Sequence, residues 1–191
     1  MKKFLMTFIA LLIITAQVEA AQFAQEQFDE MISITVQKSA AENKILALDA
    51  ATFQKNFNAF MTNFIKESNA GDDTPMLEEI FLIREPMIVQ TDAGNFLAKN
   101  FMNHVAIVGS VEADGKLKVL NFFSAPTENK NDMVITVLIF QAFTQGISPG
   151  LDVKALLGEL EKNPSAPVIR NGIKFSTDNQ GTMEIITAVA E

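Results

Sequence analysis

Four phenylalanines recur at spacings of four, three and four in the stretch FQKNFNAFMTNF, residues 53–64. At about 100° per residue, all four side chains fall inside one narrow arc of a helix. Polar side chains occupy the opposite arc, namely Lys55, Asn58, Thr62 and Asn63. The spacing predicts an amphipathic helix over 46–66 with Asp49 as its N-cap. An exposed row of this kind would approach or exceed the largest apolar patch of an ordinary monomer, roughly 300–600 Å², so something must cover it.

Two interpretations of this row remain open. In the first, the phenylalanines pack as core against the apolar face of the chain's own sheet. In the second, they line an apolar ligand cavity or a partner groove, with a neighbouring methionine as adaptable packing. The candidate ligand-binding residues under the second interpretation are Phe53, Phe57, Phe60, Phe64 and Met61.

After Ile80 the apolar pattern changes to period two, which is typical of strands. Residues 83–102 predict one hairpin, and residues 104–124 predict a second with Asp114-Gly115 in its turn. Together they predict an antiparallel meander of about four strands. Residues 168–176 and 182–190 predict terminal strands, with turn residues at Asn171-Gly172 and a loop over 177–181.

Three further segments have weaker or mixed patterns. Residues 22–37 predict a short helix that runs into a strand, because Ile32, Ile34 and Val36 alternate. Residues 133–143 are apolar nearly all round and predict a buried helix, capped by Asn131 or Asp132 and ended by Gly146. Residues 152–163 predict an amphipathic helix with Asp152 as its N-cap.

The predicted fold class is α+β: an antiparallel sheet, made of the meander and the C-terminal hairpin, packed against the phenylalanine-rich helix and a central helix pair. This order of elements resembles that of the α/β/α sandwiches of the extrinsic photosystem PsbP type. The resemblance covers element order and no motif, so it implies no functional residue. With no linker and no internal repeat, residues 21–191 are expected to form one domain.

The first twenty residues, MKKFLMTFIALLIITAQVEA, have the pattern of a secretory signal peptide. Two lysines precede a short apolar run, and Val18 and Ala20 precede the expected cleavage before Ala21. The run is shorter than the roughly 20 residues of a spanning helix, so we expect no membrane span after cleavage. An uncleaved N-terminal anchor is the alternative. We therefore expect a periplasmic or secreted protein, of a Gram-negative type of envelope.

The chain is acidic and contains no cysteine. Its formal net charge is −8, and loss of Lys2, Lys3 and Glu19 with the signal would make it −9. This charge argues against nucleic acid and anionic membranes as partners, which require clustered Lys and Arg. It permits a basic protein partner. The absence of cysteine excludes disulfides, thiol chemistry and thiolate metal sites.

Catalytic equipment is sparse in the sequence. His104 is the single histidine and has no recognisable partner, so we expect a strand-end residue with a solvated ring. The adjacent acidic pairs at 29–30, 72–73 and 78–79 do not converge by spacing alone. Asp178 and Glu184 loosely suggest a calcium loop but lack its alternating ladder, so a plain turn is expected. We predict no catalytic residue, metal or cofactor.

The leading functional hypothesis is an exported, non-enzymatic binding or interaction module of unknown target. One alternative is an acidic inhibitor or immunity-type protein that masks a basic toxin or enzyme. Another is a carrier of an apolar small molecule in a Phe- and Met-lined cavity. A carboxylate-dependent hydrolase ranks last.

Overall fold

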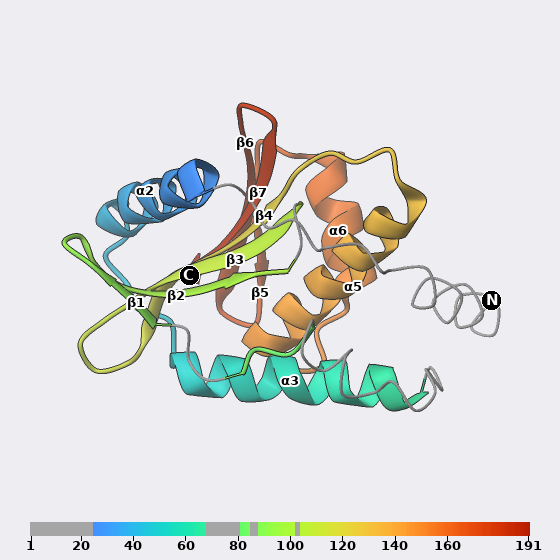
Figure 1. The fold of residues 1–191 in the computed structure, drawn as a ribbon, viewed down its shortest axis with the longest axis horizontal. Coiled ribbons are helices and arrows are strands. Elements are labelled where there is room, and N and C mark those ends of the chain that lie inside the picture. The colour runs from blue at the N-terminus through green and yellow to red at the C-terminus, as the bar shows by residue number, and fades with distance from the viewer. Residues whose placement is uncertain (1–24, 68–80, 85–87, 102–103) are drawn as a thin grey trace.

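The fold is built on a seven-stranded antiparallel sheet, seen in a computed structural model that describes residues 25–67, 81–84, 88–101 and 104–191. The strands follow the order β1-β2-β3-β4-β7-β6-β5 across the sheet (Figure 1). The helices are α2 (Gln25–Ala41), α3 (Ala50–Glu67), α5 (Lys130–Ile147) and α6 (Val153–Lys162). The strands are β1 (Ile88–Thr91), β2 (Gly94–Asn100), β3 (Val105–Val111), β4 (Leu117–Ser124), β5 (Val168–Arg170), β6 (Ile173–Gln180) and β7 (Met183–Ala190).

The predicted meander is β1 to β4, and the predicted C-terminal strands insert beside it. β7 pairs with β4, placing Thr187 opposite Asn121. β6 and β5 then extend the sheet outward as hairpins. The turn at Asn171-Gly172 has positive φ at both residues, 52° and 74°, as a two-residue hairpin turn requires. A loop was expected over 177–181, but β6 continues through Gln180. Residues 177–180 therefore pair with β7 as strand.

Both faces of the sheet are covered by helices, giving an α/β/α arrangement (Figure 1). Strands buried on both faces explain why β3 is buried along its whole length. One face packs against α3, α5 and α6 in the main core, and the other packs against α2 in a smaller cluster. The α+β class predicted from sequence is confirmed.

The main core contains a connected row of phenylalanine rings. Phe53 contacts Phe57 and Phe143 with ring centroids 6.0 and 6.3 Å apart. Phe57 continues to Phe101 at 5.4 Å, and Phe143 continues to Phe122 at 5.6 Å. Rings from α3, α5, β4 and the end of β2 thus interlock in the tilted and edge-on geometries that aromatic pairs prefer.

Helix α5 is confirmed as a buried helix, but its boundaries differ from those predicted. It begins three residues earlier, with the side chain of Asn129 accepting a hydrogen bond from the Asn131 N–H, so Asn129 rather than Asn131 or Asp132 is the N-cap. Gly146 does not end the helix but lies inside it, against the ring of Phe53. The missing side chain allows α3 and α5 to approach closely there.

The region 22–37 is helical where it is described, so the predicted change to a strand is wrong. Ile32, Ile34 and Val36 alternate, yet all three contact the cluster between α2 and the sheet because the buried face of this helix is broad. Met31, Ile34 and Thr35 are its most buried residues, at spacings of three and one. A five-residue alternation cannot separate the two structures, and the sheet face selects the helix.

The predicted N-caps of the other two helices are confirmed, although α3 begins at Ala50 and not at residue 46. Asp49 accepts a 2.7 Å hydrogen bond from the Thr52 N–H and caps α3. The Thr52 hydroxyl also donates to this carboxylate, at 3.0 Å. Both bonds lower the pKa of Asp49, and the bond from the Thr52 N–H contributes most. Asp152 accepts a 3.0 Å bond from the Ala155 N–H and caps α6.

Candidate functional site

The five residues proposed from sequence as ligand-binding lie in or against the main core. Phe53, Phe57 and Met61 have no exposed surface. Phe60 and Phe64 are half-buried and pack against the same cluster. The buried face of α3 follows positions four apart, from Phe53 through Phe57 and Met61 to Ile65, so two of the four phenylalanines fall at its edge. This is the placement that core packing predicts, and a ligand role for these residues stays a prediction.

His104 is buried rather than solvated, so the expectation of a solvated ring is wrong. The residue is 7% exposed, and its backbone carbonyl accepts a 2.8 Å bond from the Ala125 N–H. Its Nε2 atom has no hydrogen-bond partner among the described residues. A catalytic base needs a partner within reach, and the described part of the chain provides none for this nitrogen.

The acidic residues considered from sequence do not gather into a site where they are described. Asp29 and Glu30 are exposed, and Asp29 accepts a bond from Gln25. Asp178 pairs with Lys38 at 3.2 Å instead of meeting Glu184. The pairs at 72–73 and 78–79, like the signal at 1–20, lie outside the described residues. Within the described ranges, no group of three potential metal-ligating side chains occurs.

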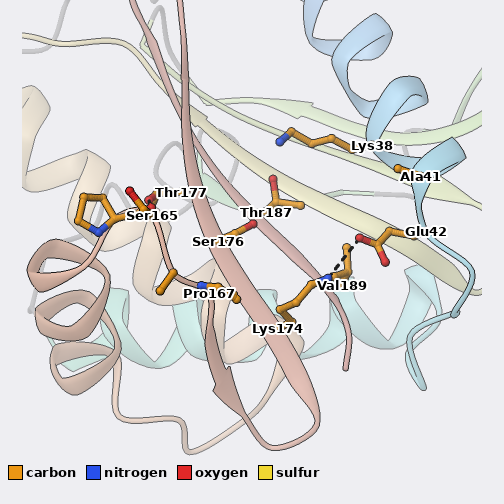
Figure 2. Close-up of a pocket in the computed structure, with 12 residues that line it drawn as sticks. Lys38, Ala41, Glu42, Ser165, Pro167, Lys174, Ser176, Thr177, Thr187 and Val189 are labelled. Carbon is orange, nitrogen blue, oxygen red and sulfur yellow. Dashed lines mark hydrogen bonds and ion pairs between the residues drawn. The ribbon is translucent and has the colours of Figure 1, made fainter.

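A pocket of about 330 Å³ opens on the α2 face of the sheet, at the end of α2 where the helix no longer covers β6 and β7. We call it the α2 pocket. Its walls are the C-terminal end of α2, the connection from α6 to β5, and strands β6 and β7 (Figure 2). The lining residues are Lys38, Ala41, Glu42, Pro164, Ser165, Ala166, Pro167, Lys174, Ser176, Thr177, Thr187 and Val189.

A buried chain of hydrogen bonds runs from the floor of the α2 pocket into the interface between α2 and the sheet. The Thr187 hydroxyl donates to Asn121 Oδ1 at 2.8 Å. Asn121 Nδ2 donates to the Thr35 hydroxyl at 2.9 Å, which donates to the Met31 carbonyl at 2.8 Å. The side chains of Asn121 and Thr35 have no exposed surface. A buried amide or hydroxyl without a hydrogen-bond partner would lower the stability of the fold, and these bonds provide the partners.

Two ion pairs lie across the opening of the α2 pocket. Lys38 on α2 pairs with Asp178 on β6 at 3.2 Å. Glu42, the residue directly after the end of α2, lies 3.5 Å from Lys174 on β6 (Figure 2). The two pairs join the helix end to the same strand.

The titratable groups with shifted pKa values lie outside the α2 pocket. Burial lowers the pKa of Lys99, whose ammonium lies 5.6 Å from the ring centroid of Phe101. Asp114 and Lys116 form a hydrogen-bonded ion pair at the exposed turn between β3 and β4. This bond lowers the pKa of Asp114 and raises the pKa of Lys116. Lys99, Asp114, Lys116 and the capping residue Asp49 all lie outside the pocket lining.

Sequence reasoning missed the α2 pocket for identifiable reasons. Lys38 and Glu42 are four residues apart, so they lie on the same side only if the helix continues to residue 41. The predicted strand at 32–36 ended the helix too early for this proximity to be recognised. Asn121 and Thr187 were visible signals, since the period-two pattern places each polar residue on an apolar strand face, Asn121 between Val119 and Phe123, and Thr187 between Ile185 and Val189. Polar residues at core positions indicate a buried hydrogen-bond network, but not its partners.

No family model, no curated protein and no solved structure matches the chain. Among the described helices, none combines the length and apolar character needed to cross a membrane.

Proposed function

We propose that this chain is an exported, non-enzymatic binding module whose ligand occupies the α2 pocket. The observation that carries the proposal is the pocket itself. Its volume, about 330 Å³, reaches the lower end of the range of small-molecule sites, roughly 300–1,000 Å³. Charged groups, hydroxyls and small apolar side chains line it together, which is the mixture that orients a ligand while excluding part of its water.

The hydrogen bonds beneath the pocket support a preformed site. Asn121 ties Thr187 in the pocket floor to Thr35 on α2, and all three side chains are nearly or fully buried. A wall that is held at several points loses little conformational freedom when a ligand enters, which favours binding.

A binding role fits the chemistry of the lining better than catalysis. A nucleophilic mechanism needs a nucleophile and a base within hydrogen-bond reach. The lining contains neither histidine nor cysteine, and both of its lysines face carboxylates. Export is supported by the signal-like pattern of residues 1–20.

One preparation tests both parts of this proposal. The full chain is expressed with its own N-terminus in a Gram-negative host, and periplasmic and membrane fractions are separated. We expect a periplasmic protein whose intact mass corresponds to a start at Ala21. A protein that stays in the cytoplasm, or in the membrane with residues 1–20 attached, would contradict export and cleavage.

The same purified protein is labelled with ¹⁵N and screened against a library of small polar metabolites. Ligands should shift the amide signals of residues 165–166, 174–177 and 187–189, and leave those of α3 unchanged. Shifts confined to the Phe53–Phe64 row would favour the apolar-carrier hypothesis instead. Recovery of a basic protein from the native envelope, with no small ligand detected, would favour the acidic-inhibitor hypothesis.

A further inference from the structure

We infer that the α2 pocket binds a small monocarboxylate that carries hydroxyl groups, with its carboxylate attracted by the positive charges of Lys38 and Lys174. This inference rests on the proposed function, because it names the ligand class of the same pocket. It follows from three properties of the lining: its net charge, the state of its ion pairs and the hydrogen-bonding roles of its hydroxyls.

The charge of the lining differs in sign from that of the chain. The chain carries −8, whereas the titratable residues of the lining are Lys38, Lys174 and Glu42, which together give +1. A single carboxylate that displaces Asp178 from Lys38 would neutralise the charge of the lining. A dianion would bring its second negative charge toward Glu42, and like charges at close range oppose binding.

Both lysines can exchange their present partners for a ligand. Asp178 is outside the lining, and its side chain is 55% exposed, so its pair with Lys38 contributes little free energy. Glu42 lies 3.5 Å from Lys174, beyond the usual distance of about 2.7–2.9 Å for a charge-assisted hydrogen bond. An ammonium has three donors, so Lys174 can keep this contact and bind a carboxylate as well.

The hydroxyls of the lining complement a hydroxylated ligand. The hydroxyl hydrogens of Thr177 and Thr187 are already donated to the Pro164 carbonyl and to Asn121, so each of these oxygens faces the ligand as an acceptor. The side-chain hydroxyls of Ser165 and Ser176 form no hydrogen bond among the described residues, so each can donate or accept. Acceptors favour a ligand that brings its own O–H donors and disfavour phosphate oxygens, which only accept.

The test uses three probes of similar size that differ in charge: gluconate, glucose and glucarate. Each is titrated into the ¹⁵N-labelled, envelope-purified chain, and amide shifts of residues 165–166, 174–177 and 187–189 are followed. We expect gluconate to bind about tenfold or more tightly than glucose and more tightly than glucarate. Its affinity should fall as sodium chloride screens the lysines.

Charge variants give effects of opposite sign. Lys38→Gln and Lys174→Gln should each weaken gluconate binding by about three- to tenfold, because each removes one positive charge. Glu42→Gln and Asp178→Asn should each tighten it by about two- to fivefold, because a lysine loses its competing carboxylate. Lys116→Gln, which removes an exposed ion pair elsewhere, is the matched control and should change nothing. Far-UV circular dichroism verifies that each variant is folded.

The outcomes separate the ligand class from the pocket. Equal binding of glucose and gluconate, tighter binding of glucarate, or weakening by all four pocket variants would overturn the monocarboxylate inference. If the metabolite library yields pocket ligands but no hydroxylated monocarboxylate is among them and gluconate does not bind, the ligand class is wrong and the proposed site stands. If neither the library nor the three probes shift pocket signals, the proposed function falls as well.

Discussion

Replacing Gly146 with alanine tests the close approach of α3 and α5 in the main core. A Cβ atom at this position would lie 2.6 and 2.9 Å from two ring carbons of Phe53. Favourable carbon–carbon contacts begin at about 3.5 Å, so the ring or the helix must move. Phe53 has no exposed surface and its ring contacts Phe57 and Phe143, so it has no free direction in which to shift.

The magnitude follows from two opposing effects. Overpacking a well-packed core lowers the free energy of unfolding by about 1–3 kcal/mol. Alanine is also the better helix former, by about 1 kcal/mol relative to glycine in a helix interior. Gly158 on α6 is the matched control, because nothing lies within 4 Å of its would-be Cβ. Gly158→Ala should therefore gain up to about 1 kcal/mol, and Gly146→Ala should be about 1–3 kcal/mol less stable than Gly158→Ala.

Urea unfolding monitored by far-UV circular dichroism measures both variants. The chain has no tryptophan and no tyrosine, so intrinsic fluorescence would report poorly. Thermal midpoints should differ by about 2–4 °C for each kcal/mol in a chain of this size. Adding Phe53→Leu to Gly146→Ala should recover part of the loss, because the smaller side chain relieves the contact. Equal stabilisation by both alanines would refute the close approach of α3 and α5.

Three further predictions concern the core, the α2 interface and the start of α3. Phe57→Ala should reduce the free energy of unfolding by about 3–5 kcal/mol. Phe64→Ala should reduce it by distinctly less, because only Phe57 is fully buried. Unchanged urea midpoints for both variants would show that the row is not core. Asn121→Ala should reduce the free energy of unfolding by about 1–3 kcal/mol, because the Thr187 hydroxyl loses its acceptor. Because Asn121 also bonds Thr35 on α2, amide hydrogen exchange should accelerate within α2 more than within α3. An unchanged exchange rate in α2 would contradict this bridging role. The folded-state pKa of Asp49 lies below its ordinary 3.8, so its carboxylate stabilises the fold above pH 3.8 and this contribution disappears as the pH falls through the lower value. Asp49→Ala should therefore be less stable than the parent at neutral pH, with a gap that closes in acid, and a gap independent of pH would rule out the capping carboxylate.

Local sequence patterns were sufficient for most elements of the sheet. Asn171-Gly172 fixes a two-residue turn, and Gly115, with a φ of 84°, closes the turn that begins at Glu112, so both hairpins are determined by nearby residues. Asp49 and Asp152 mark helix starts for a similar reason, since a cap acts on backbone groups within three residues. Features that depend on distant packing were predicted less well. The structure of 25–41, the packing of Gly146 against Phe53 and the rotation of α3 away from the centre of its phenylalanine arc all depend on the partner surface.

The α2 pocket could not be predicted from sequence because no local pattern contains it. Its lining comes from three segments, at 38–42, 164–167 and 174–189, that meet only when β7 pairs with β4 and α2 crosses the sheet. The apolar contact of α2 with the sheet is small compared with the main core, and apolar contact alone sets no unique register between a helix and a sheet. Directional hydrogen bonds do set one, and the bonds from Asn121 to Thr35 and from Thr187 to Asn121 connect the helix to the two central strands. We therefore expect the position of Lys38 and Glu42 over β6 to depend on Asn121, although neither residue contacts it through a hydrogen bond. A buried amide at the centre of the sheet would thus determine the geometry of a pocket at its surface, and ligand affinity should fall in Asn121→Ala even though every lining residue is unchanged.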